Sequence, residues 1–180
     1  KIAQGDDEAG LKALEFLNGI ESLPSEISIP LVKRLKTHPM GNESHLVASL
    51  RRETALYPDR KKAIIDSAIT LFKDRKREKL VPFIAWLKQE QQWLEIVTIV
   101  SEDEAKRHQG LLENYLTALT VLKRFDQIER LVEKDEEVKK ILDKTTHAMF
   151  RAHLAFVSNL PPEELRSRLI TAKTYAESEG

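Results

Sequence analysis

Apolar residues recur three and four positions apart along almost the whole chain, with polar residues between them. In residues 7–20, for example, the apolar positions include Leu11, Leu14, Leu17 and Ile20. This spacing is typical of amphipathic helices that bury one face. The pattern predicts an all-α chain with helices at residues 7–20, 28–37, 43–56, 59–72, 79–90, 93–100, 109–122, 126–134, 138–157 and 162–177. The segment 138–157 is either one helix or a short lead-in followed by a helix.

Glycine and proline agree with this prediction. The six glycines lie at positions 5, 10, 19, 41, 110 and 180, so residues 42–109 and 111–179 contain none. Strong helix formers dominate these stretches, which also lack the Asn-Gly and Asp-Gly pairs of β-hairpin turns. We expect the prolines to mark helix boundaries, since proline cannot donate a backbone hydrogen bond: Pro24, Pro39, Pro58, Pro82, Pro161 and Pro162.

Two windows of the sequence superpose without gaps at an offset of 32 residues. In each window an apolar-patterned helix is followed by a polar turn and an aromatic residue that opens a second helix. The matched positions are Leu80, Phe83, Leu87, Trp93, Ile96 and Val100 in the first window, and Leu112, Tyr115, Leu119, Phe125, Ile128 and Val132 in the second. Self-similarity at a fixed period indicates a tandem helix-turn-helix unit.

The segments 86–96 (WLKQEQQWLEI) and 122–131 (LKRFDQIERL) resemble the middle of a tetratricopeptide repeat. There, helix A passes through a tight turn into an aromatic residue that opens helix B, and the family period is about 34 residues. The chain departs from the small residues that the family has at its eighth, fifteenth and twentieth places. We therefore expect wider helix spacing than in the family consensus, and describe the chain as TPR-like. The departing residues are Ile84, Gln91 and Ile96 in one unit, and Leu116, Lys123 and Ile128 in the other.

The resemblance implies a right-handed superhelix of antiparallel helix pairs, an α-α solenoid formed by a single domain over residues 1–180. Its parts would be N-terminal helices in 1–42, a divergent pair in 43–75, the clearest repeats in 79–104 and 109–137, and a C-terminal pair in 138–180.

The same resemblance implies a concave face lined by A-helices that binds a peptide or protein. The family's groove positions correspond here to Glu78, Val81, Ala85, Lys88, Gln89, Glu113, Thr117, Thr120 and Val121. Only Lys88 has the charge expected of a carboxylate clamp. Capture of a peptide's C-terminus is therefore not expected.

The charge balance argues against a nucleic-acid or membrane partner. The chain has 29 Lys and Arg against 29 Asp and Glu, and no run approaches the roughly 18 apolar residues of a membrane helix. The charge is uneven, however. Residues 51–79 carry ten basic and five acidic residues, whereas 89–137 carry six basic and twelve acidic. Such a gradient would orient a partner or a second copy of the chain, or it is simply two solvated faces.

No residue set predicts catalysis, a metal or a cofactor. There is no cysteine, and His147 and His153 are six apart, not the four that would place two ligands on one helix face. Phosphate loops and nucleophile elbows are absent. The carboxylates at 102–104 and 135–137 lie in predicted turns, where we expect them to be solvated.

The sequence therefore predicts a non-catalytic interaction or scaffold module. The alternative is a structural spacer or self-assembly segment of a larger bacterial protein, including one with a membrane anchor outside these residues, with weak head-to-tail self-association. An enzyme or a nucleic-acid binder is disfavoured. The pattern leaves the compartment open.

Overall fold

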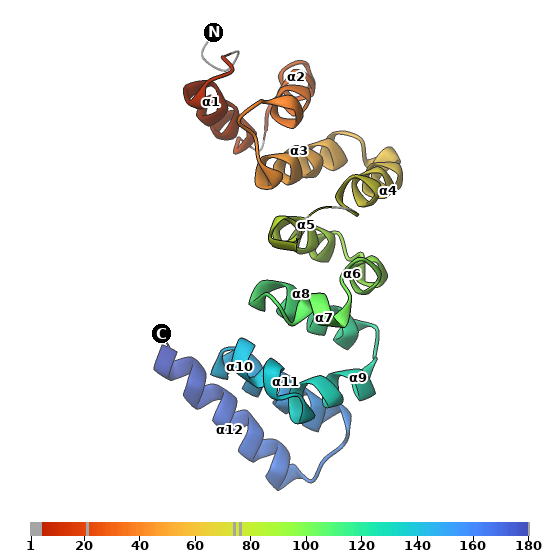
Figure 1. The fold of residues 1–180 in the computed structure, drawn as a ribbon, viewed down its shortest axis with the longest axis vertical. Coiled ribbons are helices and arrows are strands. Elements are labelled where there is room, and N and C mark those ends of the chain that lie inside the picture. Colours follow the sequence, from red (N-terminus) through yellow and green to blue (C-terminus); the bar gives the residue numbers. More distant parts are fainter. Residues whose placement is uncertain (1–4, 21, 74, 76, 180) are drawn as a thin grey trace. The chain divides into compact units, whose positions relative to one another are not determined.

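The computed structural model describes residues 5–20, 22–73, 75 and 77–179, without the side chains of Arg77, Glu78 and Glu179. Within these residues the chain contains α-helices and no strand, which confirms the all-α prediction (Figure 1). The helices are α1 (Glu8–Asn18), α2 (Ser25–Thr37), α3 (Glu43–Leu56), α4 (Lys61–Phe72), α5 (Arg77–Gln89), α6 (Trp93–Ile99), α7 (Glu102–Ala105), α8 (Gln109–Val121), α9 (Phe125–Glu129), α10 (Glu136–Ile141), α11 (Lys144–Val157) and α12 (Pro162–Glu179).

The predicted helices match these bounds closely. The segment 138–157 is a lead-in, α10, followed by α11, which is one of the two predicted alternatives. The structure differs from the prediction elsewhere. The acidic turn after α6 contains the short helix α7. A π-helical turn, Arg130–Lys134, continues α9. Pro82 was expected at a helix boundary, but it lies inside α5. It removes one helix hydrogen bond there, and its neighbours Leu80 and Phe83 are buried, so packing overrides the local preference.

Contacts divide the chain into two compact units, Lys1–Trp86 and Leu87–Gly180, and the division falls inside α5. In the first unit, α1 and α2 share an apolar core formed by Leu11, Leu14, Leu31 and Leu35, and α3 packs against α2.

An aromatic cluster joins α4 to α5 in the first unit. Phe72 and Phe83 stack with ring centroids 4.1 Å apart, and Trp86 lies 5.8 Å from Phe83. The Trp86 side chain is fully buried, although its indole N–H has no hydrogen-bond partner among the described residues.

In the second unit, one type of backbone turn follows α5, α8 and α11. Gln91, Lys123 and Asn159 all have a positive φ, between 52° and 59°. In each turn the next N–H reaches back to a carbonyl five residues earlier, for example from Arg124 to Leu119 at 2.9 Å. This is the hydrogen bond of a Schellman helix end. The turns lie 32 and then 36 residues apart, so the same turn joins α5 to α6, α8 to α9 and α11 to α12 along the chain. Of these helices, α8 contacts α9 and α11 contacts α12. The chain is compatible with an α-helical repeat fold.

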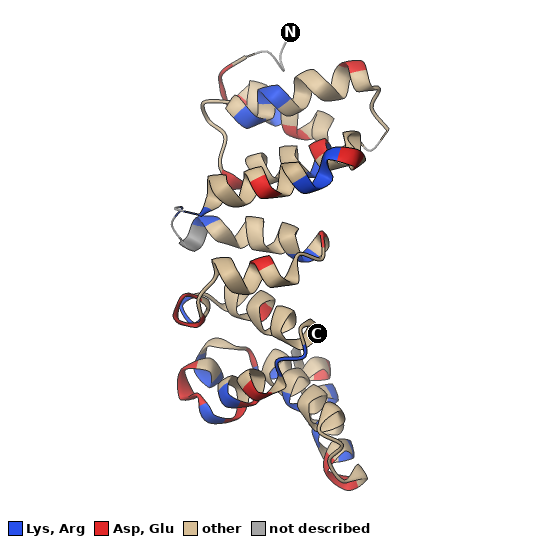
Figure 2. Ribbon diagram, turned by 90° about the vertical axis from the view of Figure 1, so that its right-hand side faces the viewer, with Lys and Arg blue, Asp and Glu red and all other residues tan. Residues whose placement is uncertain are grey.

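One residue in each acidic cluster is less solvated than expected, whereas Asp103, Glu136 and Glu137 are exposed. Lys106 Nζ lies 2.5 Å from Asp135 Oδ2 and 3.3 Å from Glu102 Oε1, and Arg130 also binds Glu102. The side chains of Lys106, Asp135 and Glu102 are only 14%, 17% and 23% exposed. Residues of both charge signs lie in this part of the second unit, residues 102–140 (Figure 2). The clusters thus link these elements, and Ser101 and Asp135 also cap the helices α7 and α10.

Candidate binding groove

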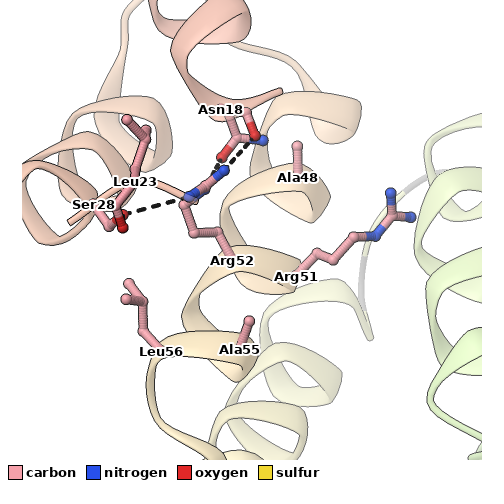
Figure 3. Close-up of a pocket in the computed structure, with 8 residues that line it drawn as sticks. All are labelled: Asn18, Leu23, Ser28, Ala48, Arg51, Arg52, Ala55 and Leu56. Atoms are coloured by element: carbon pink, nitrogen blue, oxygen red, sulfur yellow. Dashed lines mark hydrogen bonds between the residues drawn. The ribbon is translucent and has the colours of Figure 1, made fainter. Parts of the chain in front are cut away.

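Both units contain hollows among their described residues. One hollow of the first unit, about 420 Å³, lies where the end of α1 and the start of α2 meet α3 (Figure 3). Its lining residues are Asn18, Leu23, Ser28, Ala48, Arg51, Arg52, Ala55 and Leu56.

Arg52 has a structural role in this hollow. It donates hydrogen bonds to the carbonyls of Asn18 and Ile20, both at 2.6 Å, to the Asn18 side chain at 3.1 Å and to Ser28 at 3.4 Å. A cation at the end of a helix is favoured by unsatisfied carbonyls and by the helix dipole. Arg51 points away from this cluster in Figure 3. Because the donors of Arg52 are already engaged by the protein, this hollow offers little to a ligand.

One hollow of the second unit is a groove between α8 and α11, here called the α8–α11 groove. Its volume is about 370 Å³, and Lys88, at the end of α5, contributes to one rim. Its lining residues are Lys88, Glu113, Thr117, Thr120, Val121, Thr146, Met149, Phe150 and His153.

Five of the nine predicted partner-binding residues line this groove: Lys88, Glu113, Thr117, Thr120 and Val121. The others do not. Gln89 is exposed beside Lys88, Val81 and Ala85 are half-buried on the part of α5 that belongs to the first unit, and the side chain of Glu78 lies outside the described residues. The structure therefore brings together one part of the predicted set.

Apolar and acceptor groups dominate the middle of the groove. Met149 is 60% exposed and Val121 is 48% exposed. The hydroxyls of Thr117 and Thr120 donate to the carbonyls of Glu113 and Leu116, at 2.7 and 2.9 Å. Their protons are therefore engaged, and they present to the groove methyl groups and oxygen lone pairs. These walls suit an apolar side chain or an N–H donor.

The two ends of the groove differ in charge. Near the helix starts, Gln109 Nε2 donates to Glu113 Oε1 at 2.8 Å and to Asp143 Oδ2 at 2.9 Å. Asp143 caps α11. Hydrogen bonds hold the pKa of the Asp143 carboxyl below its usual value, and the largest contribution comes from the backbone N–H of Thr146. Lys88 lies near the helix ends, at the opposite rim, since α5 ends one residue after it. The groove is thus acidic at one end and basic at the other.

Sequence reasoning missed the α11 wall, which consists of Thr146, Met149, Phe150 and His153. A signal for two of these residues was present. Lys123 and Asn159 occupy equivalent turns 36 residues apart, and the same offset takes Glu113 to Met149 and Thr117 to His153. The 32-residue offset instead pairs Met149 with Thr117 and His153 with Val121, which is one helical turn out of register, because α10 and its turns lengthen the last repeat.

Most of the histidines have structural partners. His38 is buried and accepts a hydrogen bond from the Met40 N–H at Nδ1, so its Nε2–H donates to the Gly5 carbonyl at 3.1 Å. His45 and His108 accept backbone N–H groups at the starts of α3 and α8, and His147 binds the Val132 carbonyl at 2.8 Å. His153 lies in the groove beside the Phe125 ring.

The described residues contain no group of three or more His, Asp or Glu placed to hold a metal ion. Among the same residues, no helix is long and apolar enough to span a bilayer. The chain matches no model of a protein family, no curated protein and no solved structure, so its likeness to tetratricopeptide repeats depends on its own residues and helix pairs.

Proposed function

We propose that the chain is a TPR-like, non-catalytic interaction module that binds a peptide or protein segment in the α8–α11 groove. The groove would form part of the concave A-helix face of a right-handed superhelix spanning residues 1–180. The observation that carries the proposal is the convergence on one groove of five residues chosen from family groove positions, beside the exposed Met149 and Val121.

The chemistry of the groove favours binding over catalysis. A nucleophile needs a nearby base to take its proton. Thr117 and Thr120 instead donate to backbone carbonyls, and the carboxylate of Glu113 accepts from Gln109. Exposed apolar side chains flanked by charges of both signs suit a segment with a large apolar anchor and neighbouring polar residues.

The test begins with selection of a displayed random-peptide library against the wild-type protein, followed by fluorescence anisotropy of the recovered peptides. The double variant Lys88→Glu, Thr117→Arg changes the basic rim and fills the middle of the groove. We expect it to weaken binding at least about tenfold, or about 1.4 kcal/mol, with the helical CD melt nearly unchanged. Peptides recovered on the wild type should be rich in large apolar residues.

Leu94→Glu is the matched control, since Leu94 is 56% exposed on α6 and does not line the groove. It should leave peptide binding within twofold of the wild type. Peptides that bind the double variant as tightly as the wild type would remove the groove from consideration as the binding surface.

A further inference from the structure

The helix α12 leaves an apolar surface uncovered. It packs against α11 and buries Ala172, whereas Leu169 and Ile170 are 53% and 54% exposed. A hollow of about 310 Å³ runs along this side of α12. It is lined by Pro162, Leu165, Arg166, Leu169, Ile170 and Lys173. We call this surface the α12 face. Its only charged lining residues are basic.

The earlier helix pairs of the second unit show what covers the equivalent helices. The second helix of one pair packs against the first helix of the next pair, as α6 does against α8 and α9 against α11. Ile96 and Ile128, on α6 and α9, are consequently fully buried. By the same rule, a first helix is the element that fits against the α12 face.

The first helix of the chain, α1, has matching properties. Phe16 is 74% exposed, and Ile20, just beyond α1, is 37% exposed. Residues 6–20 contain four acidic residues and one basic residue. An apolar surface with acidic surroundings is complementary to an apolar surface with a basic rim.

We propose that the α12 face of one copy binds α1 of a second copy, which continues the helix packing from one chain to the next. A symmetric contact between two α12 faces is disfavoured. An antiparallel pair centred on Leu169 and Ile170 would place Arg166 of each copy opposite Lys173 of the other. Like charges in such positions repel each other. The α12–α1 contact is heterologous, so association can continue beyond a dimer.

The area available is small. Contacts between single helix pairs lie at or below the roughly 1,200 Å² of the smallest stable interfaces, so we expect dissociation constants of about 10–100 µM. Analytical ultracentrifugation of the wild type from about 10 µM to 1 mM should show a concentration-dependent rise in mass. Higher salt should reduce it, because the charges on both surfaces are exposed.

Two variants test α1 and the α12 face independently. Phe16→Lys should disable α1, and Ile170→Glu should disable the α12 face, so each variant alone should sediment as a monomer. Mixed in equal amounts, they should form a heterodimer and nothing larger, since one copy retains an intact α1 and the other an intact α12 face. Leu71→Lys and Leu94→Glu, at positions 48% and 56% exposed, are the matched controls and should associate like the wild type.

Each alternative has its own outcome, with a CD melt confirming that every variant is folded. A wild type that is monomeric at all concentrations would overturn the proposal. So would association of Phe16→Lys at wild-type strength, which would indicate an α12–α12 contact. A mixture of the two variants that stays monomeric would also exclude the heterologous contact.

Discussion

In the first unit, helix ends are held by side chains from elsewhere in the unit, whereas in the second unit a repeated backbone turn ends the first helix of each pair. Arg52 of α3 holds the end of α1, and His38 at the end of α2 reaches back to Gly5. Gln91, Lys123 and Asn159 form the three turns of the second unit from residues within the same hairpin. Long-range side-chain contacts occupy polar groups in the first unit that a ligand would otherwise use.

The hollow around Arg52 and the α8–α11 groove reflect this difference. Their volumes are similar, at about 420 and 370 Å³, but their chemistry is not. The donors of Arg52 are engaged by the protein, while the α8–α11 groove keeps exposed apolar side chains and a charged residue on each rim. The size of a hollow is therefore a poor guide to binding, and the groups left without partners are a better one.

The largest expected effect tests whether side chains from elsewhere in the first unit hold its helix ends. Arg52→Ala removes the hydrogen bonds to Asn18, Ile20 and Ser28, and should lower the free energy of unfolding by about 2 kcal/mol in urea titrations. Arg51→Ala is the matched control. Its side chain is exposed, so the change should stay within about 0.5 kcal/mol. Equal effects of the two substitutions would show that Arg52 does not hold α1.

A smaller effect tests the ionic contacts that link the elements of the second unit. The hydrogen bond from Lys106 holds the pKa of Asp135 in the folded protein below its usual value. The contact therefore stabilises the fold fully above the pKa that Asp135 has in the unfolded chain. This stabilisation is lost as the pH falls through the pKa of Asp135 in the folded protein. Asp135→Asn keeps the helix cap but removes the charge. It should cost about 1 kcal/mol at pH 7, and the difference from the wild type should shrink below about pH 4.

Urea titrations between pH 2 and pH 7 measure that difference. Glu137→Gln, at an exposed position on the same helix, is the control and should show no comparable pH dependence. An Asp135→Asn deficit that is the same at every pH would mean that the contact with Lys106 contributes nothing through its charge.

The smallest expected effect tests the repeated turn. Gln91→Gly and Lys123→Gly place glycine where φ is 59° and 57°, and each should raise the free energy of unfolding by about 0.5–1 kcal/mol. Asn159→Gly should raise the free energy of unfolding by less, because asparagine tolerates a positive φ. Thermal melts of the three variants provide the comparison. Destabilisation by glycine at Gln91 or Lys123 would contradict the turn geometry.

Local signals predicted the helices well. The bounds of α3 follow the apolar spacing and the Asn42 cap, and the 32-residue offset identified the turns at Gln91 and Lys123 as equivalent. The prediction failed where a distant contact decides the outcome. Pro82 lies inside α5 between buried neighbours, and Arg52 binds Asn18, which is 34 residues away. The α11 wall of the groove was missed because the last repeat is longer than the one on which the offset was based.

The sequence by itself determined the all-α class and most helix bounds. These features depend on apolar spacing, capping residues and turns, all of which act within a few residues. Only the tertiary structure decided which polar groups find partners and which remain available. Met149 and His153 join the groove because α11 packs beside α8, and Arg52 is engaged because α3 meets the end of α1. Such contacts join residues that are far apart in the chain, so no local pattern specifies them.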